Sequence, residues 1–310
     1  MASPRPESSL RALISGERLD RPPILLWKHF RTDQPWALAR RTVEFYRRYR
    51  LAAAKIMPDI PLLFEDFSLS SFAQVGQLRR FGRVTEVGRA SEYIRTVELT
   101  RAQLEPEDVL LVTLFSPLGL IGLWSGPSVL RELADGDRQV AHEVLWALAG
   151  VVSQLAEACV EAGADGVYYS CWGQEVLSDQ EYLELGVPYD LAGLRGAAGA
   201  EFRLLHVHGA LDAQVERYAG YPVQVVGWSE AESAISLPEG ARSLPGKVVM
   251  GGISEQWRPG SELADGQRLN ELRELLGQAF VAAPGCSLPD EVTAEALASL
   301  RGLVDQASPG

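Results

Sequence analysis

Leu204-Leu205-His206-Val207-His208-Gly209 is the stretch that most restricts both the fold and the chemistry of this chain. Its apolar start predicts a buried strand, and side chains two residues apart on a strand point to the same face. The imidazoles of His206 and His208 therefore share one face of the predicted strand. Two imidazoles on one face are half of a metal site.

A third potential metal ligand lies far downstream, where the apolar run Ala279–Ala283 predicts another strand and Cys286 follows it. If both strands belong to one barrel, their C-terminal ends share a rim, and His206, His208 and Cys286 can meet on one Zn²⁺ with a fourth position open. An open position is typical of catalytic zinc. Because His-x-His alone is a weak signal, the alternative remains that the histidines are core or surface residues and Cys286 is an inert thiol.

Composition restricts the class of protein and of partner. The chain has 310 residues, enough for two ordinary domains or one α/β barrel, and its 46% hydrophobic and 23% charged residues are typical of a globular protein. Lys and Arg number 29 against 41 Asp and Glu, a net charge of −12. This acidity disfavours binding to nucleic acid or to an anionic membrane, so the expected partner is a small molecule.

Cysteine usage and apolar runs indicate the compartment. Cys159, Cys171 and Cys286 are too widely spaced for a disulfide framework. The N-terminus lacks the apolar core of a signal peptide, and no apolar run approaches the roughly 20 residues of a spanning helix. We expect a soluble, cytoplasmic protein.

Short apolar runs alternate with segments of helical period along the chain. This alternation predicts a single (β/α)₈ TIM barrel, an α/β fold in one domain over residues 1–310, with residues 1–22 as an N-terminal leader segment. The predicted strands are Ile24–Trp27, Ala52–Met57, Val109–Leu114, Gly166–Tyr169, the stretch that begins at Leu204, Val223–Val226, Lys247–Met250 and Ala279–Ala283.

Helices are predicted between most of these strands, whereas residues 61–108 suggest irregular or hairpin structure and Phe115–Gly119 a loop. The segments with helical character are Ser9–Ser15, Trp36–Tyr49, a helix that starts at Pro127, Val140–Ala162, Asp212–Tyr218 and Ser261–Gly277.

Polar and aromatic residues concentrate at the predicted C-terminal strand ends, where such barrels hold their active sites. We predict His29 and Asp59 as catalytic groups that handle protons or orient substrate. The predicted substrate-binding residues are Trp27, Lys28, Ser116, Trp172, Trp228 and Gly251. Ordinary structural roles remain as alternatives: strand capping, turns, rim packing, a core thiol at Cys171 and, favoured over catalysis, solvated charges at Lys28 and Lys55.

These motifs, in this order, resemble those of the uroporphyrinogen decarboxylase superfamily over nearly the whole chain. The resemblance implies a barrel fold and an enzyme, and it raises the expectation of a metal and of a possible homodimer. The matching motifs are Asp20-Arg21-Pro22-Pro23, Met57-Pro58-Asp59, Phe115-Ser116-Pro117, the stretch from Ala164-Asp165-Gly166 to Trp172-Gly173, Pro188-Tyr189, His206-Val207-His208-Gly209 and Pro284-Gly285-Cys286.

Two branches of this superfamily differ in what they imply. The decarboxylase branch is similar at Asp59, its pyrrole-binding position, but its arginine-rich run is replaced here by Trp27-Lys28-His29-Phe30-Arg31. Its tyrosine falls near Leu123, and its late Gly-His-Gly near Pro284-Gly285-Cys286. A tetrapyrrole with many carboxylates would lack its cationic clamp.

The other branch contains zinc-dependent methyltransferases that move a methyl group between a corrinoid and a thiol. They carry His-x-Cys-Gly and a late Pro-Gly-Cys as zinc ligands. Here His208 replaces the cysteine, and His206, His208 and Cys286 remain an acceptable zinc set.

Three functions are therefore open. The first is a zinc-dependent methyl or alkyl transferase of a small thiol; with no corrinoid-binding domain visible, a separate corrinoid protein or free corrinoid would be the external methyl donor. The second is a cofactor-independent decarboxylase of a small acid or porphyrinogen-like substrate, in which Asp59 stabilises a protonated intermediate and Lys28 or Arg31 holds the carboxylate. The third is a non-catalytic cofactor-binding barrel.

Overall fold

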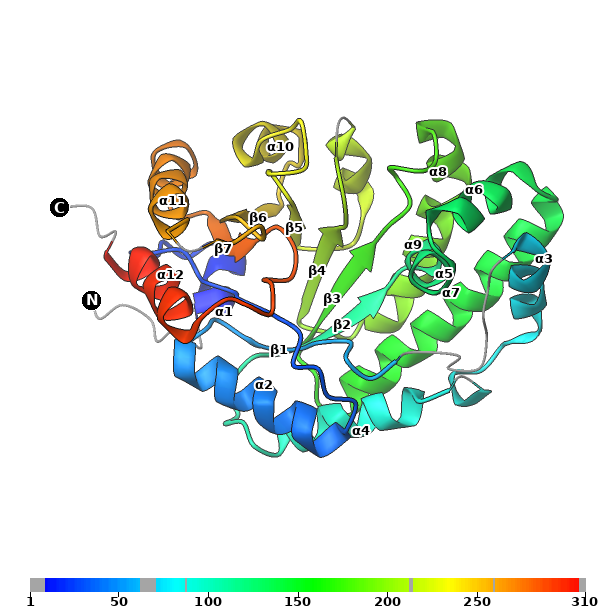
Figure 1. Ribbon diagram of the computed structural model, residues 1–310, viewed down its shortest axis with the longest axis horizontal. Helices are drawn as coiled ribbons and strands as arrows, with labels where there is room; N and C mark the ends of the chain where they lie inside the picture. The colour runs from blue at the N-terminus through cyan, green and yellow to red at the C-terminus, as the bar shows by residue number, and fades with distance from the viewer. Residues whose placement is uncertain (1–8, 62–70, 87, 212–213, 259, 307–310) are drawn as a thin grey trace.

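A curled sheet of seven parallel strands forms the centre of the computed structural model, which describes residues 9–61, 71–86, 88–211, 214–258 and 260–306. Each strand pairs with the next one along the chain, and helices cover the outside of the curl (Figure 1). The strands are β1 (Ala54–Ile56), β2 (Leu110–Phe115), β3 (Gly166–Cys171), β4 (Phe202–Val207), β5 (Val225–Trp228), β6 (Val248–Ile253) and β7 (Phe280–Pro284).

The seven predicted strands that follow Ile24–Trp27 agree with β1 to β7 to within a few residues at each end, because each is a short apolar run buried on both faces. The first predicted strand, Ile24–Trp27, is wrong as a regular strand. It forms only isolated bridges, from Ile24 to Ala282 and from Lys28 to Leu288. The two bridges are four residues apart in this segment but six apart on its partner, so the two segments cannot pair in one continuous register.

The chain around Ile24 nevertheless contacts both edges of the sheet. The Leu25 N–H donates to the carbonyl of Ala282 in β7 at 2.9 Å, and the Ala52 N–H, just before β1, donates to the carbonyl of Ile24 at 2.9 Å. The segment therefore lies between the last strand and the first.

An inner apolar cluster fills the space that the strands enclose. It takes alternate residues from the strands, among them Leu111, Leu204 and Val281, and adds Leu10 and Leu13 from helix α1 (Ser9–Ile14). Helix α1 thus closes one end of the enclosed space. A second, larger cluster packs the outer face of the sheet against the helices.

The remaining helices surround the sheet. They are α2 (Pro35–Tyr49), α3 (Phe72–Val75), η2 (Gly76–Arg80), η3 (Val84–Glu86), α4 (Ala90–Arg101), α5 (Pro117–Ser125), α6 (Pro127–Asp135), α7 (Arg138–Glu161), α8 (Asp179–Leu185), α9 (Val187–Leu194), η4 (Arg195–Ala197), η5 (Val215–Gly220), α10 (Leu237–Ser243), α11 (Glu262–Leu276) and α12 (Ala294–Gln306).

Helix α4 corrects the expectation of irregular structure over 61–108, of which residues 62–70 and 87 lie outside the described chain. It buries Ala90, Tyr93 and Val97 in one stripe, and the Tyr93 hydroxyl donates to the carbonyl of Thr113 in β2 at 2.8 Å. Polar residues between those positions weaken the sequence pattern, so tertiary contacts determine this helix.

Two smaller corrections follow. Helix α5 begins at Pro117, inside the predicted loop, because Ser116 caps it. The helix predicted over Asp212–Tyr218 is the 3₁₀ helix η5, and residues 212–213 lie outside the described chain. Helix α7 is, by length and hydropathy, able to cross a membrane, but half of its most apolar stretch is buried inside the protein.

Candidate functional site

A cavity of about 690 Å³ opens at the C-terminal ends of the strands, opposite the end closed by α1. Trp27, Met57 and Tyr168 belong both to the inner cluster and to the cavity wall, so the cluster forms the cavity floor. The remaining lining residues are His29, Lys55, Pro58, Pro61, Thr113, Phe115, Gly119, Leu120, Gly122, Leu123, Trp124, Ser170, Trp172, His206, His208, Cys286 and Ser287.

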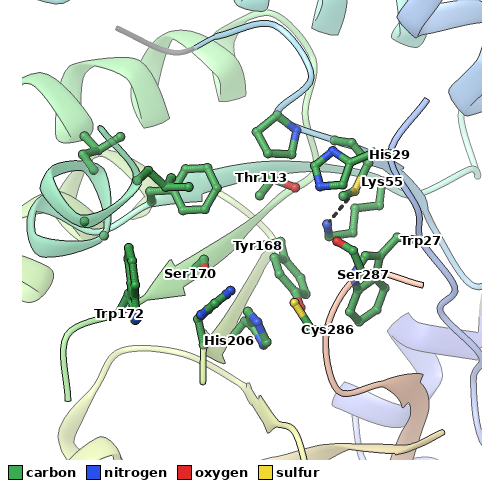
Figure 2. Close-up of a pocket in the computed structure, with 18 of the residues that line it drawn as sticks. Trp27, His29, Lys55, Thr113, Tyr168, Ser170, Trp172, His206, Cys286 and Ser287 are labelled. Carbon is green, nitrogen blue, oxygen red and sulfur yellow. Dashed lines mark hydrogen bonds between the residues drawn. The ribbon is translucent and has the colours of Figure 1, made fainter. Parts of the chain in front are cut away.

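Six of the predicted site residues line this one cavity although they come from distant parts of the chain. Figure 2 shows Trp27, His29, Trp172, His206 and Cys286 around it, on different elements. His208 completes the set. The C-terminal ends of β3, β4 and β7 and the segment that follows Ile24 therefore bring these residues to one cavity.

The two histidines of the His-x-His motif face the same cavity. His206 lies on β4, paired with Ser170 of β3 and Gly227 of β5, and is only 4% exposed. The ring centroids of His206 and His208 are 5.9 Å apart. His206 Nε2 and His208 Nδ1 are buried without a hydrogen-bond partner. Buried nitrogens without partners are uncommon, and in a cavity they are available to a ligand.

Burial holds His206 neutral. Removal from water lowers its pKa well below the usual value, and the proximity of the basic groups of His208 and Lys55 lowers it further. A neutral imidazole keeps a lone pair on one ring nitrogen, which is the form that binds metals or accepts protons.

Cys286 follows β7 and is half-buried in the cavity wall. Burial raises the pKa of its thiol, and Lys55 opposes this effect. Gly285 allows the chain to pass closely here, because a Cβ at that position would lie 2.6 Å from Ser229 Cα. A cation near Cys286 is thus needed to make it a thiolate at neutral pH.

The donor set fits zinc by its chemistry. His206 Nε2 and His208 Nδ1 have no hydrogen-bond partner, and Cys286 offers sulfur to the same cavity. As the side chains stand in the described part of the chain, no group of three His, Cys, Asp or Glu side chains lies close enough to hold a metal ion. Metal binding would therefore need side-chain movements toward a common point.

His29 and Asp59 form a hydrogen-bonded pair at the side of the cavity. Asp59 Oδ1 bonds His29 Nδ1, and Asp59 Oδ2 accepts from the Phe30 N–H at 2.6 Å. The Asp59 side chain is only 3% exposed and does not line the cavity, whereas His29 does. A carboxylate oxygen accepts here from Nδ1, so Nε2 is the ring nitrogen that does not bond Asp59.

Lys28 and Ser116 lie outside the cavity lining. Lys28 Nζ donates to the carbonyl of Asp290 at 2.9 Å. Ser116 is fully buried, and its Oγ accepts from the Gly119 N–H at 3.0 Å as the cap of α5. Both side chains have structural partners instead of facing the cavity.

Trp228 and Gly251 also lie away from the cavity, on the outer side of the sheet. Trp228 is fully buried in the outer core and its Nε1 donates to the carbonyl of Ile235 at 3.0 Å. A Cβ at Gly251 would lie 2.9 Å from the side chain of Leu237 in α10. Gly251 thus gives room to a helix.

Lys55 is the cavity residue that sequence analysis treated as a solvated charge. It lies on β1 and is only 7% exposed, and burial lowers its pKa to about 7. Its Nζ lies 4.1 Å from the Tyr168 ring centroid and 5.0 Å from that of Trp27. The available signal was a lysine inside the apolar run Ala52–Met57, where a charge is unfavourable.

Comparison with known proteins places the chain in a family. A family model described as "Uroporphyrinogen decarboxylase (URO-D)" matches residues 5–307. No curated protein matches the chain. A solved methyltransferase from Methanosarcina mazei superposes with a TM-score of 0.77 at 14% identity, over 97% of this chain and 98% of that one.

Two methionine synthase structures share the fold more distantly. The B12-independent enzyme from Shewanella sp. W3-18-1 has a TM-score of 0.59 at 10% identity, over 92% of this chain and 91% of that one. The putative enzyme from Listeria monocytogenes has 0.60 at 14% identity, over 87% and 85%. At these low sequence identities the structural similarity shows a shared fold only. The family is shown by the family model, which matches residues 5–307: this chain belongs to the uroporphyrinogen decarboxylase family.

Proposed function

We propose that this protein is a zinc-dependent methyl or alkyl transferase that acts on a small thiol. The observation that carries the proposal is the pair of buried nitrogens without partners, His206 Nε2 and His208 Nδ1, in the same cavity as Cys286. The fold shared with a methyltransferase and with methionine synthases supports the same reaction class.

His206, His208 and Cys286 would hold the metal. When bound, a zinc ion supplies the positive charge that keeps a substrate thiol, with a free pKa of roughly 8.5, deprotonated at neutral pH. The neutral state of His206 suits this role, because only an unprotonated imidazole coordinates a metal.

His29 receives the proton that the thiol loses. Its Nδ1 is bonded to Asp59, which leaves Nε2 on the cavity side as the acceptor. Asp59 is held by the Phe30 N–H and stabilises the charge that His29 gains. The bond from the methyl group to its donor then breaks as the carbon–sulfur bond forms.

Aromatic side chains in the cavity wall exclude water from the reacting groups. Trp27 and Trp172 line the cavity, and Trp172 packs against His208 with ring centroids 5.6 Å apart. An apolar wall favours the neutral methyl group and excludes water from the thiolate. We propose a corrinoid, bound to a separate protein or free, as the external methyl donor.

Metal analysis tests the ligand set. We expect the purified wild-type protein to contain zinc by inductively coupled plasma mass spectrometry, and the His206→Ala, Cys286→Ala double variant to lose it. His142→Ala is the control, because His142 lies on α7 and bonds Tyr189 and Glu184, away from the cavity. Equal metal content in the wild type and the double variant would contradict the proposal.

Turnover tests the reaction. We expect wild-type protein to consume methylcobalamin in the presence of a small thiol, followed by its absorbance, and Cys286→Ser to lose this activity. Full activity of a metal-free Cys286→Ser protein would contradict the mechanism. The decarboxylase alternative predicts activity on acids with chelator present, but its expected carboxylate-binding residues, Lys28 and Arg31, both bond Asp290 outside the cavity.

We also propose that residues 24–28 take the place of the eighth strand and close the sheet into a barrel. Support comes from the backbone bonds of Leu25 to β7 and of Ala52 to Ile24. Slow hydrogen exchange at the Leu25 and Ala52 amides is the expected result, and rapid exchange at both would oppose closure.

A further inference from the structure

The described lining of the cavity has basic residues but no acidic ones. Among its described lining residues, Lys55 is the one lysine or arginine, three histidines accompany it, and no aspartate or glutamate takes part. A cavity with cationic and basic groups and no acidic group is complementary to an anion.

Lys55 is buried without an ionic partner. Its Nζ contacts Met57 Sδ at 3.2 Å and the faces of the Trp27 and Tyr168 rings, and no carboxylate of the described residues lies within ion-pair distance. Aromatic faces and a thioether compensate only part of the lost hydration of an ammonium group. Burial therefore lowers the pKa of Lys55 to about 7, and an anion beside Nζ would restore the charged form.

A second polar group beside Lys55 is also without a partner. Tyr168 is 2% exposed, lines the cavity, and its hydroxyl has no hydrogen-bond partner. A phenol hydroxyl without a partner can donate a hydrogen bond to a ligand in the cavity. The neighbouring Thr113 hydroxyl, by contrast, already donates to the carbonyl of Ile56 at 2.7 Å.

We propose that Lys55 and Tyr168 bind the carboxylate of the substrate, which makes the substrate class a small organic acid whose other end carries the thiol. Figure 2 shows Lys55 and Tyr168 between His29 on one side and His206 and Cys286 on the other. The Tyr168 ring stacks on that of His206 with centroids 5.5 Å apart, so a carboxylate held here lies beside the proposed metal ligands. This inference rests on the proposed function and specifies its substrate.

The carboxylate would receive two hydrogen bonds, one charge-assisted from Lys55 Nζ and one from the Tyr168 hydroxyl. Both donors are otherwise poorly satisfied, so little hydrogen bonding is lost when they turn to a ligand. A neutral substrate of the same shape would leave the ammonium group without an anion and bind more weakly.

Binding of a thioether acid tests this inference separately from the metal. The probes are 3-(methylthio)propionate and its amide, which have no free thiol, and binding is measured by isothermal titration calorimetry on chelator-treated protein. We expect wild-type protein to prefer the acid by about tenfold or more, the value of a charge-assisted bond. Lys55→Met should remove this preference and leave the amide affinity unchanged.

Two further variants guard against a folding artefact. Tyr168→Phe keeps the ring and should weaken only the acid, by a few-fold. Lys247→Met is the matched control, since Lys247 bonds the carbonyls of Tyr221 and Val223 outside the cavity, and it should keep the full preference. Equal affinity for acid and amide in the wild type, absence of acid binding, or full preference in folded Lys55→Met would each overturn the inference while the metal result stands by itself.

Discussion

Replacement of Lys55 by methionine should stabilise the protein. Methionine keeps the length and apolar stem of lysine but removes the ammonium group, which is buried against Trp27 and Tyr168. Burial lowers the pKa of Lys55 from 10.5 to about 7. This shift corresponds to a loss of folding stability of about 5 kcal/mol at low pH, where Lys55 is charged in both the folded and the unfolded state, and of about 4 kcal/mol at pH 7. This figure is a ceiling, because local relaxation and lost cation–aromatic contacts reduce it.

The sign of the pH dependence follows from proton binding. Between pH 7 and 10.5 the folded wild type binds fewer protons at Lys55 than the unfolded chain does, so its free energy of unfolding rises with pH across this window. Lys55→Met lacks this contribution. The advantage of the variant should therefore be largest at or below pH 7 and decrease as the pH rises toward 10.5.

Urea unfolding of both proteins at several pH values between 6 and about 9.5 measures this difference. Lys28→Met is the control, because Lys28 donates to a backbone carbonyl outside the cavity. A Lys55→Met protein that is less stable than wild type at every pH, or whose advantage does not change with pH, would refute the reasoning.

Other substitutions test the supporting structure. Asp59→Asn should lower methyl-transfer turnover by about 100-fold with zinc content unchanged, because His29 loses its charged partner; unchanged turnover would exclude the pair from catalysis. Gly285→Ala should destabilise the protein by about 1–3 kcal/mol, seen by urea unfolding, because its Cβ would meet Ser229. Tyr93→Phe should cost about 1 kcal/mol by the same measurement, since a buried carbonyl loses its donor, and an unaffected stability would question the placement of α4.

Strand position could be predicted from the sequence, but side-chain direction could not. Apolar runs located the strands β1 to β7, and their ends located His206, His208 and Cys286. Successive side chains of a strand point to opposite faces of the sheet, so an error of one residue in the expected register reverses the direction of every side chain. Val225 and Met250 belong to the inner cluster, so Trp228 and Gly251, at odd spacing from them, face outward.

The same alternation explains why Lys55 was misjudged. Ala53 and Met57 both belong to the inner cluster, which places Lys55 on the inward face of the same run. A lysine in an apolar run can extend its ammonium group to solvent or point it into the space that the sheet encloses. Only the pairing register with the neighbouring strand decides between these two orientations. The helix over Ala90–Arg101 is not evident from the sequence for a related reason, since it packs mainly against α2, which lies far earlier in the chain.

The closure of one end of the sheet by α1 has a kinetic consequence. With Leu10 and Leu13 packed among the inner side chains, substrates and products have to pass through the opposite opening. With the proposed small acid as substrate and the proposed corrinoid as donor, the acid has to enter before the bulky donor covers that opening, and its product can leave only after the donor departs. We therefore expect a compulsory order of binding and release, with the small substrate first.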